Sequence, residues 1–117
     1  MERDKQNLLH KVLTVVSEET GVPELAIVSR SRKRPASDAR KIFCNVIWYN
    51  KEMDFSLREI GEIINRDHSD VIHNRDRADD IKITDREFRM KLNKVRERFN
   101  LNNYNFLIET FENIPQL

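Results

Sequence analysis

The stretch that decides the fold, residues 56–77, reads SLREIGEIINRDHSDVIHNRDR. Ser56 and Glu59 have the spacing of a capping box, in which a hydroxyl and a carboxylate satisfy free amides at the start of a helix. Asp67 is placed to cap a second helix after a very short turn. Two short helices joined so tightly predict a helix-turn-helix unit that spans roughly Ser56 to Arg77.

Helical spacing of apolar residues predicts the elements before this unit. A first helix carries an apolar stripe, and Gly21 ends it; the stripe is Leu8, Leu9, Val12, Leu13, Val15 and Val16. Pro23 opens a short turn of helix. Ser37 is interpreted as the N-cap of a long helix that reaches about Lys51. Its predicted apolar face holds Ile42, Val46, Ile47 and Tyr49.

The same reasoning predicts two further helices after the unit. Residues 84–87, Thr-Asp-Arg-Glu, repeat the capping-box spacing and open a helix with Phe88, Leu92, Val95 and Phe99 on one face. A last amphipathic piece extends from Tyr104 to about Phe111. These aromatic residues, with Phe106, either complete the core or form a surface for a second copy or a partner.

Length and composition favour an all-α fold. The chain has 117 residues, enough for one core, and its two glycines and three prolines leave little material for the turns of a many-stranded sheet. We expect a compact bundle of six to seven helices that contains the helix-turn-helix. Residues 1–83 are expected to form the binding unit, and residues 84–117 a helical extension packed on it within one structural domain.

The charge of the chain is unevenly distributed. The net charge is only +1, whereas duplex-binding domains are usually distinctly basic. Between residues 30 and 41, however, a single acidic residue, Asp38, faces Arg30, Arg32, Lys33, Arg34, Arg40 and Lys41. This run is interpreted as an electrostatic footprint for a polyanion, and the alternative is an ordinary solvated stretch.

Several function classes are disfavoured. No apolar run approaches the 20 or so residues of a membrane span, and the first residues lack the layout of a secretory signal, so a cytoplasmic, nucleoid-associated location is expected. Cys44 is the only cysteine and is expected to be buried. His68 and His73 lack the spacing of paired metal ligands. No phosphate loop and no nucleophile–base pair is recognisable, so we expect no enzyme activity, cofactor, metal or small-molecule substrate.

The second helix of the unit begins with Arg66, Asp67, His68, Ser69 and Asp70. In helix-turn-helix proteins, such N-terminal residues meet base edges in the major groove, and these side chains are suited to reading bases or gripping phosphate. The plainer interpretations are that Asp67 is only a cap and that His68 is an ordinary surface residue.

These motifs resemble a known family. The segment SRSRKR at residues 29–34, then ARKI at 39–42, SLREIG at 56–61 and RDHS at 66–69 resemble the C-terminal DNA-binding domain of DnaA, the bacterial replication initiator. The resemblance covers about Leu8 to Ile81. It implies a Trp-repressor-like domain that binds a short, asymmetric, A/T-rich box in double-stranded DNA and serves replication initiation or its regulation.

The resemblance also implies roles for individual residues. Arg32 is implied to enter the minor groove, with Arg34 as the alternative. Asp67, His68 and Ser69 match base-contacting positions. Three further arginines match family positions that contact the DNA or its phosphates: Arg58, Arg66 and Arg77.

The chain departs from the family pattern at some positions. Asp70 stands where the family has a threonine at the DNA interface; its carboxylate is able to accept from cytosine N4 but would repel a phosphate. Asp76, Asp79 and Asp80 lower the positive charge along the same helix.

Two functions therefore remain. The first is sequence-specific duplex binding by a regulatory module without an ATPase. The alternative is a protein-interaction module on the same fold that has lost or weakened DNA binding. In either case, the C-terminal helices are candidates for contact with a second copy or a replication protein.

Overall fold

The computed structural model describes residues 3–50 and 53–112, with side chains described as far as Phe99. Over these ranges the chain forms six helices and no strand, which confirms the all-α prediction. The helices are α1 (Arg3–Thr20), α2 (Glu24–Ile27), α3 (Arg34–Tyr49), α4 (Leu57–Ile64), α5 (His68–Thr84) and α6 (Arg86–Glu112).

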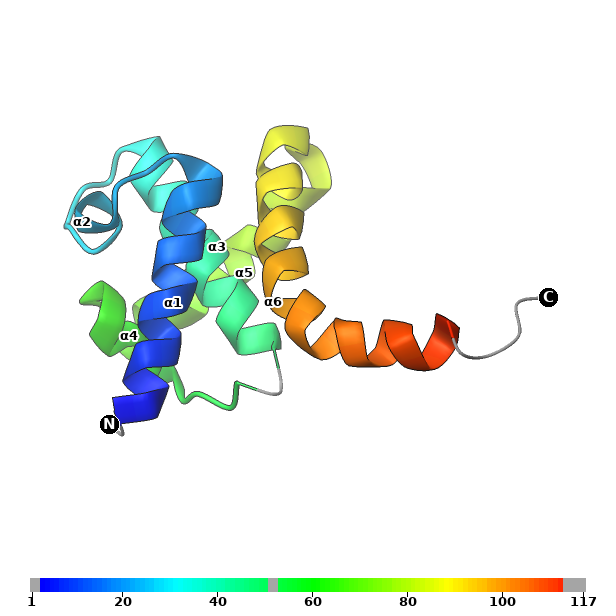
Figure 1. Cartoon of the computed structure of the whole chain (residues 1–117). Helices are drawn as coiled ribbons and strands as arrows, with labels where there is room; N and C mark the ends of the chain where they lie inside the picture. Colours follow the sequence, from blue (N-terminus) through cyan, green and yellow to red (C-terminus); the bar gives the residue numbers. More distant parts are fainter. Residues whose placement is uncertain (1–2, 51–52, 113–117) are drawn as a thin grey trace.

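Helix α3 is the centre of the bundle and packs against each of the other five helices, most extensively against α5. Figure 1 shows α1 lying across α3, with α4 to the left of α1, and both α4 and α5 also pack against α3. The buried positions of α3 cover much of its circumference, as expected for a helix enclosed by others. Its side chains Ile42, Phe43 and Ile47 meet Val12 and Val16 of α1 in one continuous core.

The predicted start of α3 was wrong. The helix begins at Arg34 rather than after Ser37, and Lys33 is its N-cap without a side-chain hydrogen bond. Pro35 stands in the first turn, where its missing N–H has no helical partner to lose. The Ser37 hydroxyl instead accepts from Nζ of Lys41, one turn along. The helix ends at Tyr49, which is half exposed instead of buried, and the predicted end at Lys51 lies outside the described residues.

The junction between α5 and α6 also differs from the prediction. Thr84 is the last residue of α5, so it does not cap the next helix. Asp85 takes that role, because its carboxylate accepts from the N–H of Phe88 at 3.0 Å. Beyond it, α6 is a single helix, whereas two separate helical pieces were predicted for the same residues.

The first half of α6 completes the core and the second half leaves it. Phe88, Leu92, Val95 and Phe99 are buried, as their spacing predicted. After Phe99 the helix projects from the body of the molecule, as Figure 1 shows at the orange-to-red end of the chain. Phe106 and Phe111 lie in this part, beyond the last described side chain.

Two further observations bear on the functional classes. No helix of the described residues combines the length and hydropathy that a membrane span requires. Cys44 is fully buried, and burial raises the pKa of its thiol to about 12. A thiol that is inaccessible and protonated acts as a small apolar core group.

Candidate nucleic-acid interface

The helix-turn-helix begins with the predicted capping box. The N–H of Glu59 donates to the Ser56 hydroxyl at 3.1 Å, and the N–H of Ser56 donates to the Glu59 carboxylate at 3.0 Å. The bond from the Ser56 backbone lowers the pKa of Glu59. Ile60 and Ile64 are buried beneath this helix, so α4 is fixed both at its start and along its inner face.

A close backbone approach makes the turn between α4 and α5. Asn65 adopts a left-handed conformation with φ of 59°, and the N–H of Arg66 then donates to the carbonyl of Gly61 at 2.9 Å. A Cβ on Gly61 would lie 2.2 Å from the carbonyl oxygen of Arg66. Glycine is therefore required at this position by the space that the returning chain leaves.

The amino end of α5 is presented to solvent. Asp67 is the N-cap, as predicted, and its carboxylate accepts from the N–H of Asp70 at 2.9 Å. The side chains of His68, Ser69 and Asp70 are exposed in the first turn. Free backbone amides and the helix dipole contribute positive potential at this end, and the carboxylates of Asp67 and Asp70 oppose it.

Residues 28–33, here termed the basic loop, lie beside this helix end. Arg30, Arg32 and Lys33 are exposed, and the ion pairs of the described residues include none of them. The link to the turn is direct, because Nη2 of Arg66 donates to the carbonyl of Ser29 at 2.8 Å. The basic loop and the turn of the helix-turn-helix are thus parts of one surface.

A groove of about 970 Å³ joins the basic loop, α3 and the amino end of α5. Among its basic and acidic lining residues are Arg30, Arg32, Arg40, Lys41, Arg66, Glu62, Asp67 and Asp70. Basic side chains outnumber acidic ones in this set. The positive charge predicted from the sequence between residues 30 and 41 is therefore concentrated next to the helix that the sequence predicts for base contacts.

A second, shallower hollow lies next to the groove. Its lining includes His68, Arg58 and Trp48, together with Phe55 and Leu57. Asp67 lines the groove and His68, the next residue, lines the hollow. The amino end of α5 therefore lies between the basic loop on one side and the start of α4 on the other.

Arg34 lies apart from the other predicted residues. It lines a different cavity, where it pairs with Asp38 at 3.6 Å and with Asp85 at 3.2 Å. Arg32 lines the groove directly. Of the two arginines named for the minor groove, Arg32 lines this groove and Arg34 does not.

Three aspartates of α5 have cationic partners. Asp76 pairs with Arg75 at 2.8 Å and Asp80 with Arg77 at 3.6 Å. Asp79 pairs with Lys82 and does not line the groove. The described residues contain no ion pair of Asp70, whose carboxylate lines the groove next to Asp67. Of these departures from the family pattern, Asp70 is the one that faces the proposed interface.

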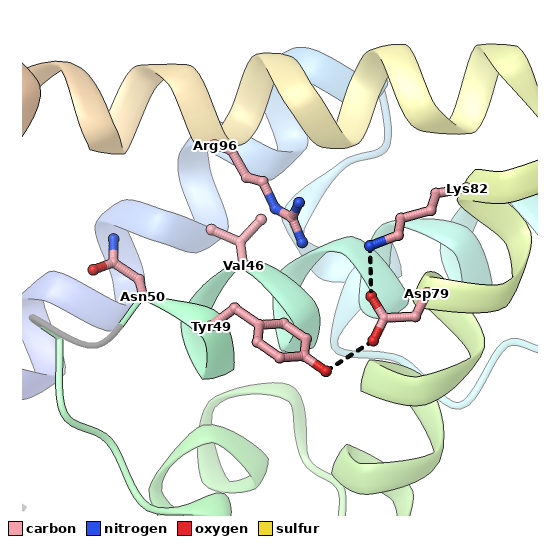
Figure 2. Close-up of a pocket in the computed structure, with 6 residues that line it drawn as sticks. All are labelled: Val46, Tyr49, Asn50, Asp79, Lys82 and Arg96. Atoms are coloured by element: carbon pink, nitrogen blue, oxygen red, sulfur yellow. Dashed lines mark hydrogen bonds and ion pairs between the residues drawn. The ribbon is translucent and has the colours of Figure 1, made fainter.

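The partners of Asp79 form a polar seam between α3, α5 and α6. Figure 2 shows Tyr49 and Lys82 pointing at the Asp79 carboxylate, with distances of 2.8 and 3.0 Å. The buried amide of Asn45 donates to the same carboxylate at 3.0 Å and accepts from Arg96 of α6. Burial raises the pKa of Asp79, but the hydrogen bonds from Asn45, Lys82 and Tyr49 outweigh it and lower that pKa overall.

Sequence reasoning did not single out two residues of the groove floor. Arg40 is only 4% exposed, and Lys41 is half buried; burial lowers the pKa of both. Both belong to the basic run between residues 30 and 41, but the composition of this run does not indicate which of its cations are buried. The useful signal is their position on α3 between buried Ala39 and Ile42, where helical spacing directs them partly inward.

Comparison with known proteins agrees with this geometry. A family model described as the bacterial dnaA protein helix-turn-helix matches residues 9–77. The match covers most of α1, all of α2 to α4 and the first part of α5, including the basic loop. Among curated proteins, no sequence matches the chain. The described residues contain no group of three or more His, Cys, Asp or Glu side chains arranged to hold a metal ion.

Proposed function

Because the chain belongs to the bacterial DnaA helix-turn-helix family, a family of DNA-binding domains, we propose that it binds double-stranded DNA sequence-specifically at short sites resembling DnaA boxes. The observation that carries the proposal is the shared groove, in which Arg32 of the basic loop and Asp67 of the α5 amino end line one surface. A duplex lying across this surface would meet the loop and the helix end in adjacent grooves.

In the proposed complex, the amino end of α5 enters the major groove. His68, Ser69 and Asp67 contact base edges, and Arg32 reaches into the adjacent minor groove, where narrow A/T-rich sequence attracts a guanidinium. Arg58, Arg66 and Arg77 contact phosphates and set the register. Arg34 is given no base contact in this arrangement, because it lines a different cavity, where it pairs with Asp85.

Asp70 gives the proposed site a preference of its own. Its exposed carboxylate only accepts hydrogen bonds, and cytosine N4 is the major-groove donor that matches such a group. We therefore propose a C·G base pair at the position opposite Asp70. Discrimination there is expected to be about 1–3 kcal/mol, the usual range for a good base contact.

The proposed role is that of a module without ATPase activity. The helix-turn-helix domain of this family is non-catalytic, and the 117 residues contain no G-x-x-x-x-G-K-[ST] loop for nucleotide phosphates. Residues 1–83 would form the binding module, and residues 84–117 an extension for a second copy or a replication protein. Such a module would regulate replication initiation, or compete with an initiator, by occupying its sites.

Selection of bound sequences from a random duplex pool, repeated at two salt concentrations, tests the proposal. We expect one enriched, asymmetric site with an A/T-rich end and a C·G pair. Affinity should fall steeply with salt, because each neutralised phosphate releases counterions. The matched variants are Arg32→Ala, which should relax the A/T preference, and Ser69→Ala, which should relax the preference in the major groove.

The competing function is a protein-interaction module, and the near-neutral net charge together with the carboxylate of Asp70 favours it. It predicts no mobility shift with any duplex at low salt and retention of a defined protein partner. Equal binding of the wild type and both variants to every duplex in the pool would likewise count against sequence-specific recognition.

A further inference from the structure

Two arginines anchor the backbone around the basic loop from beneath. Nε of Arg40 donates to the carbonyl of Ile27 at 2.7 Å, and its Nη2 donates to the carbonyl of Ser31 at 2.6 Å. Arg66 binds the carbonyl of Ser29, between these two. The anchored carbonyls thus belong to alternate residues along the chain. Three hydrogen bonds from two separate elements fix the path of a segment only five residues long.

The residues between and after the anchors are the ones that face outward. Arg30 and Arg32 alternate with Ser29 and Ser31, and both are exposed and line the groove. Val28, Ser29 and Arg30 form a turn and bends after α2, so the three bonds fix an irregular backbone path from which the side chains of Arg30 and Arg32 emerge exposed. The placement of Arg32 therefore depends on the bonds that Arg40 and Arg66 make.

Arg40 is an unusual anchor, because it is a buried cation that forms none of the ion pairs found among the described residues. Buried charges in proteins are usually paired with an opposite charge. Backbone carbonyls satisfy this guanidinium and leave its positive charge in place under the groove. Arg66 lies near enough for its charge to lower the pKa of Arg40, after the larger effect of burial.

We propose that Arg40 is a positioning residue for minor-groove recognition, which holds the basic loop so that Arg32 projects toward the duplex, without touching DNA itself. The inference rests on the proposed function. Arg66 supports the same arrangement through Ser29. Lysine does not replace Arg40, because a single ammonium lacks the planar two-nitrogen fork that spans the carbonyls of Ile27 and Ser31.

The test compares Arg40→Lys with a matched control. Arg89 also donates to two backbone carbonyls, those of Lys82 and Ile83, but at the far end of α5. Arg89→Lys therefore makes the same substitution away from the groove, at an arginine that binds its two carbonyls through a single nitrogen, Nη1. Both variants and the wild type are titrated with the selected duplex, with a duplex whose A/T-rich end is replaced by G/C, and with one whose C·G pair is changed.

We expect Arg40→Lys to lower the A/T-over-G/C affinity ratio about tenfold, the size of one lost base contact, and to leave the C·G ratio within about twofold. Arg89→Lys should change neither ratio. A folded Arg40→Lys protein that keeps the wild-type A/T ratio would overturn the inference. An equal fall in both ratios would also overturn it, because that result indicates a general loss of structure instead of a displaced loop.

Arg66→Lys keeps the inference testable if Arg40→Lys does not fold. The Arg66 side chain is less buried, and its replacement removes the Ser29 anchor while keeping a positive charge. A selective fall of the A/T ratio supports the inference, and an unchanged ratio contradicts it. A wild-type protein without any duplex preference would contradict the proposed function itself. If the wild type shows a preference and both Arg40→Lys and Arg66→Lys retain it, only the positioning role of Arg40 is contradicted.

Discussion

The groove and the polar seam use the same kinds of residue in opposite ways. In the seam, the carboxylate of Asp79 receives three donors, and Arg96 is bound to Asn45. In the groove, Arg30 and Arg32 form no ion pair with the described residues, although acidic side chains line the same depression. The seam satisfies its polar groups internally, and the groove leaves Arg30 and Arg32 exposed without ion pairs among the described residues.

A nearly neutral chain can thus carry a locally basic surface. The net charge of +1 is the sum over two regions that differ in how their charged side chains are paired. A charge that is already paired within the fold contributes little to the long-range attraction of a charged partner. The seam residues Asp79, Lys82 and Arg96 also lie beyond the family match, which ends at residue 77. The polar contacts that join α6 to α3 and α5 therefore depend partly on residues outside the family match.

The largest effect is expected where the groove depends on the turn. Gly61→Ala should destabilise the fold by about 3 kcal/mol, because the added Cβ would lie 2.2 Å from a backbone oxygen of Arg66 and the turn must open. Duplex binding should be lost with it. Denaturant unfolding and a duplex titration measure the two quantities.

Gly21→Ala is the matched control for this substitution. Gly21 has φ of 75° but no atom within 4 Å of its would-be Cβ, so only the backbone preference is lost, at about 1 kcal/mol. It should leave duplex affinity unchanged. Equal destabilisation by the two substitutions would show that the close approach at Gly61 is not what holds the turn.

A crossed pair of truncations tests the comparison directly. Arg32→Ala should weaken duplex binding by about 2 kcal/mol and leave thermal stability almost unchanged, because its side chain is exposed and forms no ion pair with the described residues.

Arg96→Ala should do the reverse. It removes the partner of the buried Asn45 oxygen and should cost about 1–2 kcal/mol of stability without a change in affinity. The two effects are measured by thermal unfolding and by titration at fixed salt. If each variant changed both quantities, the division between a binding region and an internally satisfied region would be wrong.

Local sequence signals predicted the fold where they act over a few residues. The capping box at Ser56, the cap at Asp67 and the apolar spacing from Phe88 to Phe99 were all confirmed, because each depends on contacts within one or two turns. The predicted start of α3 was wrong because two local signals compete there. Ser37 is a good N-cap residue and Pro35 suits a first turn, and in the structure the helix starts early enough to place Pro35 in its first turn.

The site was less predictable than the fold. The sequence identified the basic run and the amino end of α5, but not which cations turn inward. Arg40 and Arg34 look alike in the run, yet one is buried under the loop and the other pairs with Asp85, 51 residues away in the chain. Such long-range partners are set by the packing of α3 against its neighbours, which no local pattern records.

A smaller effect is expected from the pH dependence of the seam. Hydrogen bonds lower the pKa of Asp79, so its contribution to stability is present above the ordinary value of 3.8 and is lost as pH falls through the lowered value. Asp79→Asn should cost about 1 kcal/mol near neutral pH, and the gap to the wild type should narrow as the pH falls below about 4. Urea unfolding across this range measures it.

The exposed pair of Asp80 with Arg77 supplies the control for this measurement. Its distance of 3.6 Å and the high exposure of both side chains predict a contribution below about 0.5 kcal/mol, so Asp80→Asn should follow the wild-type curve. A gap for Asp79→Asn that stayed constant down to pH 2 would mean that the carboxylate charge does not stabilise the seam.

The smallest effect concerns Cys44, which lies on α3 between the two regions. Burial raises the pKa of its thiol to about 12, so near pH 8 the folded state should hold far less thiolate than the unfolded chain. Alkylation should therefore be slow in the native protein and follow its opening. Arg96→Ala should speed alkylation, because it loosens the packing of α6 on α3, and Arg32→Ala should not. Rapid alkylation of the wild type, or equal acceleration by both variants, would mean that the core beneath the groove and the core beneath the seam open together.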